Sequence, residues 1–261
     1  MKLKDAIATL LRDGFILVFN EDRLDVVRTA EALQEVGVGN MEVTCRIRRP
    51  LEKIARLRKE VPRMLIGAAS LIDFPGMLET YDRHHADDPL PSVERVAEAG
   101  AGFLVSAVNF SDETYADFAG KLPIIPGCGT ATEIVEQFSC GANLCKIFPA
   151  KELGGPAFVK AVDPAIHKMI SLVPTGGTSA ANIGDYVAAG VLVVGASFSM
   201  IDKAVMARAI DEQNYALLAA EFKKIKALID EHRAAKYPTL DWRKATAEQV
   251  SAATGRNFNA T

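Results

Sequence analysis

Short runs of apolar residues alternate along this chain with longer stretches in which apolar residues recur at helical spacing. Near-continuous apolarity rich in Val, Ile, Leu and Phe is typical of parallel strands that are covered on both faces. Eight such runs occur, and each is followed by a loop and a helical pattern. The predicted strands span residues 15–19, 41–45, 63–68, 102–106, 122–126, 144–148, 169–173 and 191–194.

The intervening stretches have the periodicity and the end signals of helices. Residues 23–36 carry apolar residues every three or four positions, and Gly37 follows as a C-cap candidate. Residues 130–138 and 179–189 show a similar pattern, and each opens with a Thr or Ser that can serve as an N-cap.

The number of strand–helix units distinguishes between two α/β architectures. An open doubly wound sheet would also alternate strands and helices, but eight units on 261 residues favour a closed (β/α)8 barrel, the TIM barrel. We therefore predict a single domain over residues 1–261, with a barrel core at about residues 14–205.

Three segments lie outside the eight units. Residues 2–12 form an amphipathic pattern that predicts an N-terminal helix able to close the bottom of the barrel. Residues 73–91 are a long polar insertion after strand 3. Residues 206–261 predict a helical C-terminal extension, whose last residues we expect to be poorly ordered unless they dock.

Composition limits the classes of partner that the protein can bind and the cellular compartment in which we expect it. Hydrophobic residues make up 49% of the chain and the formal net charge is −3, so there is no electrostatic case for nucleic acid or an anionic membrane. The N-terminus lacks the pattern of a secretory signal, and no apolar run approaches the roughly 20 residues of a membrane span. The four cysteines form no C-x-x-C pair, which favours reduced thiols over zinc ligands. We expect a cytoplasmic protein.

Lys146 is the first candidate for chemistry, because it lies within a predicted buried strand between apolar residues. Burial of a lysine disfavours its charged form, and the neutral amine can attack a carbonyl carbon. The alternative is a structural lysine that pairs with a neighbouring strand.

Glu42 and Arg46 are candidates because alternation along the second strand places Glu42, Thr44 and Arg46 on the same side. If that side is the barrel interior, Glu42 can relay protons and Arg46 can bind a substrate carboxylate. A structural Glu42–Arg46 ion pair explains the same pattern equally well.

Two loops rich in small residues predict an anion site. Residues 173–178 (VPTGGT) end strand 7 and residues 194–197 (VGAS) end strand 8. The loops after these strands commonly bind phosphate in this fold through backbone N–H groups. The Gly176–Gly177 pair would be weak evidence without that position, since a tight turn also uses such a pair.

Two further candidates carry less weight. Ser70 follows strand 3 and can donate a hydrogen bond to a carboxylate, although a loop serine is an equal interpretation. His84 and His85, with Asp87 and Asp88 nearby, have the composition of a metal site, but a solvated polar loop explains them better.

Four segments together resemble the family of 2-keto-3-deoxy-6-phosphogluconate (KDPG) and 4-hydroxy-2-oxoglutarate (KHG) aldolases. They are residues 37–46 (GVGNMEVTCR), 123–127 (PIIPG), 141–154 (GANLCKIFPAKELG) and 174–177 (PTGG), in family order and spacing. The likeness extends from about residue 10 to residue 203.

The resemblance implies a class I aldolase that forms a Schiff base and uses no metal or other cofactor. It implies that Lys146 is the Schiff-base lysine and Glu42 the acid/base group. Arg46, Ser70 and Thr175 match positions that hold the oxo-acid end, and Gly176, Gly177 and Ser197 match the phosphate subsite. The implied substrates are a 2-keto-3-deoxy sugar acid or KHG, cleaved to pyruvate and an aldehyde, and the implied assembly is a homotrimer.

The chain departs from the family pattern after the first, third and fourth strands. Asn20 stands where many relatives have an arginine near the phosphate or aldehyde end, and residues 67–70 read GAAS instead of GAGT. These departures leave other functions open: a non-catalytic barrel that binds a sugar-acid phosphate, or a Schiff-base lyase or decarboxylase on another 2-oxo acid. An isomerase is compatible with the fold alone, but it does not explain Lys146 together with Glu42.

Overall fold

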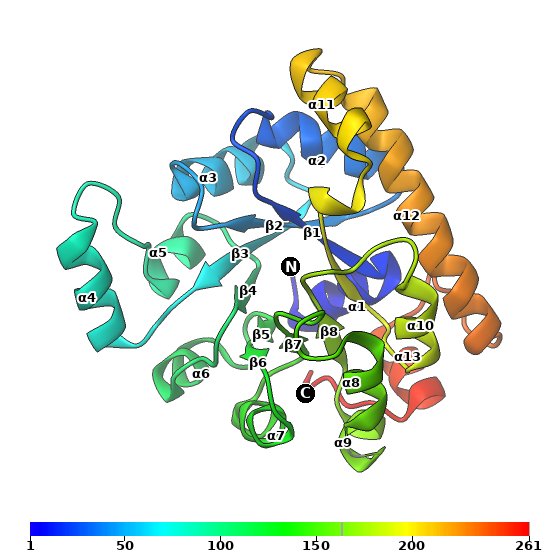
Figure 1. The fold of residues 1–261 in the computed structure, drawn as a ribbon. Helices are drawn as coiled ribbons and strands as arrows, with labels where there is room; N and C mark the ends of the chain where they lie inside the picture. The colour runs from blue at the N-terminus through cyan, green and yellow to red at the C-terminus, as the bar shows by residue number, and fades with distance from the viewer. Residues whose placement is uncertain (163, 261) are drawn as a thin grey trace.

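The computed structural model describes residues 1–162 and 164–260 as a ring of parallel strands surrounded by helices (Figure 1). The pairings between the described strands are parallel, and strand and helix alternate along the chain as the apolar pattern predicts. The strands are β1 (Phe15–Phe19), β2 (Asn40–Thr44), β3 (Leu65–Leu71), β4 (Phe103–Ser106), β5 (Ile124–Ile125), β6 (Gly127–Cys128), β7 (Cys145–Ile147), β8 (Leu172–Pro174) and β9 (Val194–Ser197).

The ring consists of two hydrogen-bonded groups, ordered β5-β4-β3-β2-β1-β9 and β6-β7-β8. The predicted fifth strand is divided into β5 and β6 at Pro126, which has no N–H to continue the ladder. Between β8 and β9, the Thr178 hydroxyl donates to the Gly195 carbonyl at 2.7 Å. The eight predicted strand positions are therefore confirmed, and together these strands form the wall of a barrel.

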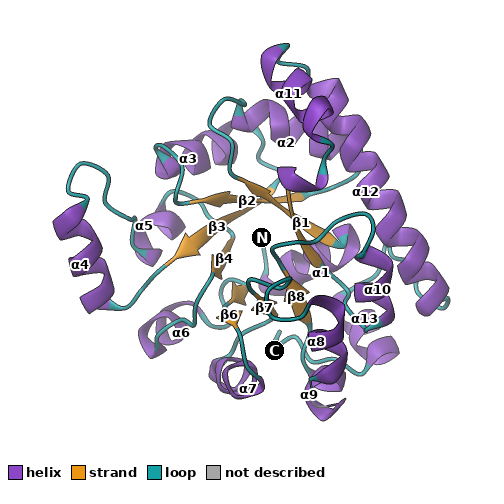
Figure 2. Ribbon diagram, in the orientation of Figure 1, coloured by secondary structure: helices purple, strands orange, loops and turns teal. Residues whose placement is uncertain are grey.

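Helices cover the outside of the ring (Figure 2). Several begin at a side-chain cap, such as Asp25 before α2 and Thr130 before α7. The barrel helices are α2 (Val26–Glu35), α3 (Pro50–Glu60), α5 (Val93–Glu98), α6 (Asp112–Phe118), α7 (Ala131–Cys140), α8 (Gly155–Ala161), α9 (Pro164–Met169), α10 (Ile183–Ala188) and α11 (Lys203–Asp211), with a 3-10 turn η1 (Phe198–Met200) before α11.

Alternation along each strand separates two apolar layers. On β1, Phe15, Leu17 and Phe19 pack outward under the helices, whereas Ile16 belongs to the cluster inside the barrel. On β7, Cys145 and Ile147 belong to the outer layer. The side chain between them, Lys146, is therefore directed into the barrel interior.

The predicted N-terminal helix is α1 (Leu3–Asp13), and it closes the bottom of the barrel. Its residues Ile7, Leu10 and Leu11 are fully buried in the inner cluster, together with Leu65 and Phe103 at the starts of their strands. With this end filled by side chains, the interior opens only toward the carboxyl ends of the strands among the described residues.

The C-terminal extension is helical, as predicted, and consists of α12 (Tyr215–Lys236) and α13 (Ala247–Thr254). The helix α12 packs against α2 and α10 along the outside of the barrel (Figure 1). The end of the chain is docked: Asn143 Nδ2 donates to the Phe258 carbonyl at 2.8 Å, and Phe258 is buried in the inner cluster. Thr261 lies outside the described residues.

The insertion at residues 73–91 contains α4 (Pro75–His84), which projects from the barrel and has no buried residue (Figure 1). Its first residue, Asp73, anchors it by accepting hydrogen bonds from Ser111 N at 2.8 Å and Thr114 Oγ1 at 2.6 Å. The insertion thus starts beside α6, at the catalytic end of a barrel of this type.

Three strand boundaries were placed too early by the apolar pattern. The last predicted strand, 191–194, is observed as β9 at Val194–Ser197, because Leu192 and Val193 are buried at the barrel bottom outside any ladder. The seventh, predicted at 169–173, is β8 at Leu172–Pro174, and the third extends to Leu71. Apolarity alone cannot separate strand residues from a buried loop that precedes them.

Candidate active site

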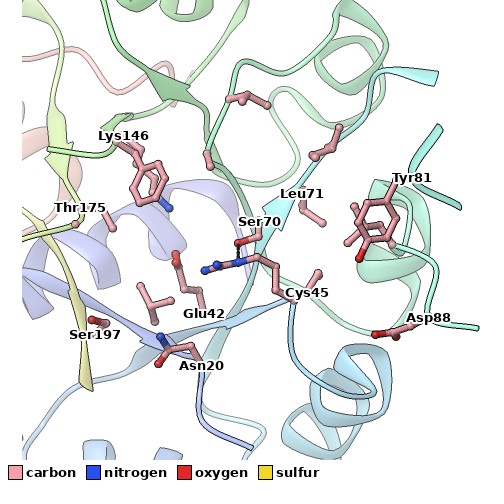
Figure 3. Close-up of a pocket in the computed structure, with 18 residues that line it drawn as sticks. Asn20, Glu42, Cys45, Ser70, Leu71, Tyr81, Asp88, Lys146, Thr175 and Ser197 are labelled. Atoms are coloured by element: carbon pink, nitrogen blue, oxygen red, sulfur yellow. Dashed lines mark hydrogen bonds between the residues drawn. The ribbon is translucent and has the colours of Figure 1, made fainter. Parts of the chain in front are cut away.

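A cavity of about 590 Å³ opens at the carboxyl ends of the strands. It is lined by residues of β1, β2, β3, β7 and β9, by the loops that follow β4 and β8, and by part of the insertion (Figure 3). Seven of the eight predicted site residues line it: Glu42, Arg46, Ser70, Lys146, Thr175, Gly176 and Ser197. The eighth, Gly177, lies outside the lining and packs against the Lys151 side chain.

Lys146 is fixed at the centre of this cavity by ladders on both sides. It pairs with Gly127 of β6 and with Val173 of β8, and its N–H donates to the Pro126 carbonyl at 2.8 Å. The side chain is only 5% exposed, and its Nζ lies 5.2 Å from the centre of the Phe148 ring. Burial lowers the pKa of Lys146, an effect that the nearby Glu42 charge opposes and Arg46 reinforces.

Glu42 is directed toward Lys146 from β2 on the other side of the interior (Figure 3). Its pairing with Val18 of β1 and Gly67 of β3 fixes the backbone on both sides. The side chain is buried, and its Oε1 has no hydrogen-bond partner among the described residues. Burial raises the pKa of Glu42, while the charges of Lys146 and Arg46 lower it. A carboxyl group of this kind can hold a proton and release it to a reacting atom.

Ser70, Thr44 and Arg46 form a connected polar group at the ends of β2 and β3. The hydroxyl groups of Thr44 and Ser70 are 2.9 Å apart, and Arg46 Nε donates to Ser70 Oγ at 3.0 Å. Ser70 has a left-handed backbone with φ of 60°, and the β3–β4 register shifts between Ala68 and Leu71. The strand irregularity thus directs the Ser70 hydroxyl to the guanidinium group, which suits a carboxylate site.

Thr175, Gly176 and Ser197 line the opposite side of the cavity, at the ends of β8 and β9. Gly176 and Gly177 both have positive φ, at 86° and 75°, a conformation that favours glycine. A Cβ on Gly195 would collide with Thr175 Oγ1, so only glycine lets the two strands approach this closely. This side of the cavity therefore presents the hydroxyl groups of Thr175 and Ser197 and the backbone of Gly176 to a bound substrate.

The insertion contributes lining residues that the sequence pattern did not indicate. Tyr81 and Asp88 lie across the cavity from Lys146 (Figure 3), and Leu90 joins them. Val108 and Phe148 also line the cavity, after β4 and β7. The position of the insertion after a barrel strand was the available signal, but no local pattern indicates which of its residues turn inward.

The histidines and cysteines form neither a metal site nor a reactive thiol among the described residues. His85 stacks on Tyr81 with ring centres 4.3 Å apart, and the described residues contain no group of three or more His, Cys, Asp or Glu side chains placed to hold a metal ion. Cys45, Cys128 and Cys145 are buried free thiols, and Cys140 is exposed. Cys45 lines the cavity, where burial and the Glu42 charge raise its pKa to about 12, so it remains a thiol.

The arrangement combines an amine shifted toward its neutral form, a carboxyl group shifted the same way and a guanidinium–hydroxyl pair. Attack of the amine on a carbonyl, proton transfer at the adjacent carbon and binding of a carboxylate can all occur in this cavity. Along the described chain, no helix is long and apolar enough to cross a bilayer.

The chain is similar in sequence and in structure to known aldolases. The model of the family described as "KDPG and KHG aldolase" matches residues 89–218. The 2-dehydro-3-deoxy-phosphogluconate aldolase of Pseudomonas aeruginosa is 34% identical over 206 residues, which cover 77% of this chain and 85% of the relative. The KHG/KDPG aldolase of Escherichia coli strain K12 is 32% identical over 173 residues, covering 66% of this chain and 73% of the relative.

Among solved structures, one of a KDPG aldolase from Legionella pneumophila matches with a TM-score of 0.67 and 26% identity. The match covers 84% of this chain and 97% of that one. That structure holds pyruvate captured at low pH as a covalent carbinolamine intermediate. The comparison therefore extends over nearly the whole length of the solved protein.

Proposed function

The chain belongs to the KDPG and KHG aldolase family, and we propose that it is a class I aldolase that uses Lys146 as its Schiff-base residue. As a member of a family of aldolases, it is a carbon–carbon lyase. It reversibly cleaves a 2-keto-3-deoxy sugar acid or 4-hydroxy-2-oxoglutarate to pyruvate and an aldehyde, which is glyoxylate in the second case. The observation that carries the proposal is the buried Lys146 amine directed toward the Glu42 carboxyl group in the cavity.

The first step is attack of the neutral Lys146 amine on the C2 carbonyl of the oxo acid. Protons move to the carbonyl oxygen, and loss of water from the carbinolamine gives a protonated imine. Arg46, with Ser70 at 3.0 Å, is placed to bind the neighbouring carboxylate and so to orient C2 toward the amine. The lowered pKa of Lys146 favours this step because it increases the fraction of neutral amine.

The second step is cleavage of the C3–C4 bond. Glu42 takes the proton of the C4 hydroxyl group, the aldehyde leaves, and the bonding electrons pass into the iminium to form an enamine. Glu42 then returns the proton to C3, and water releases pyruvate from Lys146. A buried carboxyl group with a raised pKa can act in both directions of this proton transfer. The iminium supplies the electron sink, so the proposed reaction uses no metal and no other cofactor.

The remaining site residues have supporting roles in this proposal. Thr175, directly after β8, borders the imine, and Gly176 and Ser197 border the aldehyde. Gly177 shapes the turn after Gly176 from outside the cavity lining.

We also propose a homotrimer in the cytoplasm. Exposed apolar side chains such as Met77 and Val135 are available for burial in an assembly, and the free thiols suit a reducing compartment. Light scattering after size exclusion should give three times the 28.1 kDa chain mass. A mass of one or two chains would contradict the trimer.

The test of the chemistry is borohydride reduction with pyruvate, followed by intact-mass and peptide mass spectrometry. We expect one pyruvate adduct on the peptide that carries Lys146, absent in Lys146→Ala and retained in Lys160→Ala, which changes an exposed lysine on α8. Absence of any adduct from the folded wild-type protein would refute the class I mechanism. It would favour a barrel that binds sugar acids without cleaving them.

A further inference from the structure

We propose, on the basis of the function above, that the acceptor aldehyde is an uncharged hydroxyaldehyde and not a phosphorylated one, and that Asn20 helps set this preference. Two properties of the site support this: the direction in which the substrate must extend from Lys146, and the charges of the side chains that it then meets.

The acceptor end is identified by elimination of the carboxylate end. Arg46 follows β2 and Ser70 lies on β3. With the carboxylate bound there and C2 at Lys146, the rest of the substrate extends past Glu42, away from Tyr81 and toward the ends of β9 and β1 (Figure 3). Ser197 pairs with Val18, and Asn20 follows Val18 by two residues. Figure 3 shows Asn20 and Ser197 close together, on the far side of Glu42 from Ser70. The aldehyde therefore leaves toward Asn20 and Ser197.

The side chains at this end carry no charge. Asn20, Thr175 and Ser197 are the polar residues of this part of the lining, beside Val18 and Gly176. Among the described residues that line the cavity, the cations are Lys146 and Arg46, and both are used at the other end of the substrate. A phosphate group with a charge near −2 would have no opposite charge in the lining on this side, so the anion site predicted at the loops after β8 and β9 would have to hold it through backbone N–H and hydroxyl groups without a cation.

The remaining charged residues of the lining are Glu42 and Asp88, both acids. Neither supplies an opposite charge to a phosphate group: burial shifts Glu42 toward its neutral form, and Asp88 lies on the insertion side of the cavity beside Tyr81 (Figure 3). The lining therefore has no charge at the acceptor end that would favour a phosphorylated aldehyde over an uncharged one.

Cations near this rim are held by other groups. Arg23 pairs with Glu21 at 2.7 Å, and Lys53 pairs with Asp22 at 2.9 Å. The loop after Asn20 thus adds two carboxylates: Glu21 pairs with Arg23, and Asp22 lies near both Lys53 and Arg48.

Lys151 is a further cation in this region, and it packs along Gly177 outside the lining of the cavity. Hydroxyl groups can instead exchange hydrogen bonds with the Asn20 amide and the Ser197 hydroxyl, which lies 2.6 Å from that of Ser199.

The experiment compares two acceptors in the condensation with pyruvate, D-glyceraldehyde and D-glyceraldehyde 3-phosphate. We expect kcat/KM for D-glyceraldehyde to be at least tenfold higher in the wild-type protein. A tenfold preference for the phosphorylated aldehyde would overturn the proposal. So would turnover of neither acceptor by a protein that forms the pyruvate imine. Failure to form the imine would instead refute the proposed function. Borohydride reduction measures imine formation separately from turnover of the aldehyde.

Two opposite charge substitutions test Asn20 itself. Asn20→Arg should raise kcat/KM for the phosphorylated aldehyde at least tenfold, and Asn20→Asp should lower it while leaving D-glyceraldehyde the better acceptor. Thr132→Arg, which adds the same charge on the exposed face of α7, should not change the preference. If Asn20→Arg and Asn20→Asp shift the preference in the same direction, or not at all, Asn20 does not face the acceptor.

Discussion

The Glu42 carboxyl group on β2 and the Lys146 amine on β7 are directed toward each other across the barrel interior, and burial shifts both pKa values toward the neutral forms (Figure 3). Each charge opposes the shift of the other, since opposite charges stabilise one another. The barrel thus holds a nucleophile and a proton carrier in one cavity, and substitution of the carboxyl group tests how the two depend on each other.

Replacement of the carboxyl group should slow catalysis without abolishing the covalent step. Glu42→Gln removes the proton carrier, so we expect kcat for cleavage to fall by roughly 100- to 10,000-fold. Borohydride should still trap pyruvate on Lys146. Glu35→Gln on the exposed face of α2 is the matched control and should keep kcat within about twofold of wild type. An equally small loss for Glu42→Gln would remove Glu42 from the mechanism.

The same variant has a second effect, on the pH dependence of imine formation. The Glu42 charge raises the pKa of Lys146, so its removal should lower that pKa further. Because attack needs the neutral amine, the rate rises with pH through the pKa of Lys146. The rise should therefore occur at lower pH in Glu42→Gln, as measured by the initial rate of adduct trapping. A displacement to higher pH would contradict the electrostatic coupling.

Asp13 makes stability depend on pH. Burial raises its pKa from 3.8 to about 6, against the hydrogen bonds that it accepts from Asn40 and Gly39. The folded state binds this proton more tightly, so the contribution is complete below pH 3.8 and is lost as pH rises through about 6. Asp13→Asn keeps an acceptor oxygen but cannot ionise. Its unfolding free energy should therefore fall less than that of the wild-type protein as pH rises, and the difference should be up to about 3 kcal/mol. Urea titrations at pH 4.5 and 7.5 measure this, with exposed Asp211→Asn following wild type.

Arg233 secures the C-terminal extension to the barrel. It is fully buried, donates to the Leu11 carbonyl at 2.5 Å and the Asp230 carboxylate at 2.6 Å, and lies over the Trp242 ring at 4.2 Å. Arg233→Met leaves buried acceptors without a donor and should cost about 3–5 kcal/mol of unfolding free energy. Arg208→Met, at an exposed ion pair, should cause no measurable loss. Chemical denaturation of both variants decides whether the buried contacts stabilise the fold.

Two glycines give opposite expectations for the same substitution. A Cβ on Gly67 would collide with the Phe103 ring inside the barrel, so Gly67→Ala should destabilise the protein by about 1–3 kcal/mol. Gly76 lies in α4 with open space around it, and Gly76→Ala should stabilise that helix by about 0.5–1 kcal/mol. Thermal unfolding of the two variants compares them directly. Equal midpoints would show that the barrel interior can move aside for a methyl group.

The period of two along each strand was sufficient to group the candidates of one strand, but not to say which side is the interior. Alternation placed Glu42, Thr44 and Arg46 on one side of their strand, and the structure shows that Met41 and Val43 face outward, so that side is the barrel interior. Strand boundaries were less certain, because the buried residues Leu192 and Val193 have strand-like apolarity without strand pairing. Hydrophobicity reports burial, whereas a strand also requires a hydrogen-bonded neighbour.

The insertion marks the limit of the local pattern. The sequence placed it after strand 3, but nothing in it indicated that Tyr81 and Asp88 line the cavity while Met77 of the same helix as Tyr81 is exposed. That outcome depends on the direction in which α4 leaves the barrel. The hydrogen bonds from Ser111 and Thr114 to Asp73 set this direction. These partners are about forty positions away in the chain and leave no local periodic signal.

The sequence by itself determined the order of strands and helices, which residues share one side of a strand and the residue types that can do chemistry, because these depend on side chains a few positions apart. The tertiary structure decided which groups share one cavity and how strongly burial shifts them. Desolvation of Lys146 and Glu42 arises from the closed ring of strands around them, with α1 filling its far end. Such burial is a property of the whole packed chain, so no local pattern can specify it.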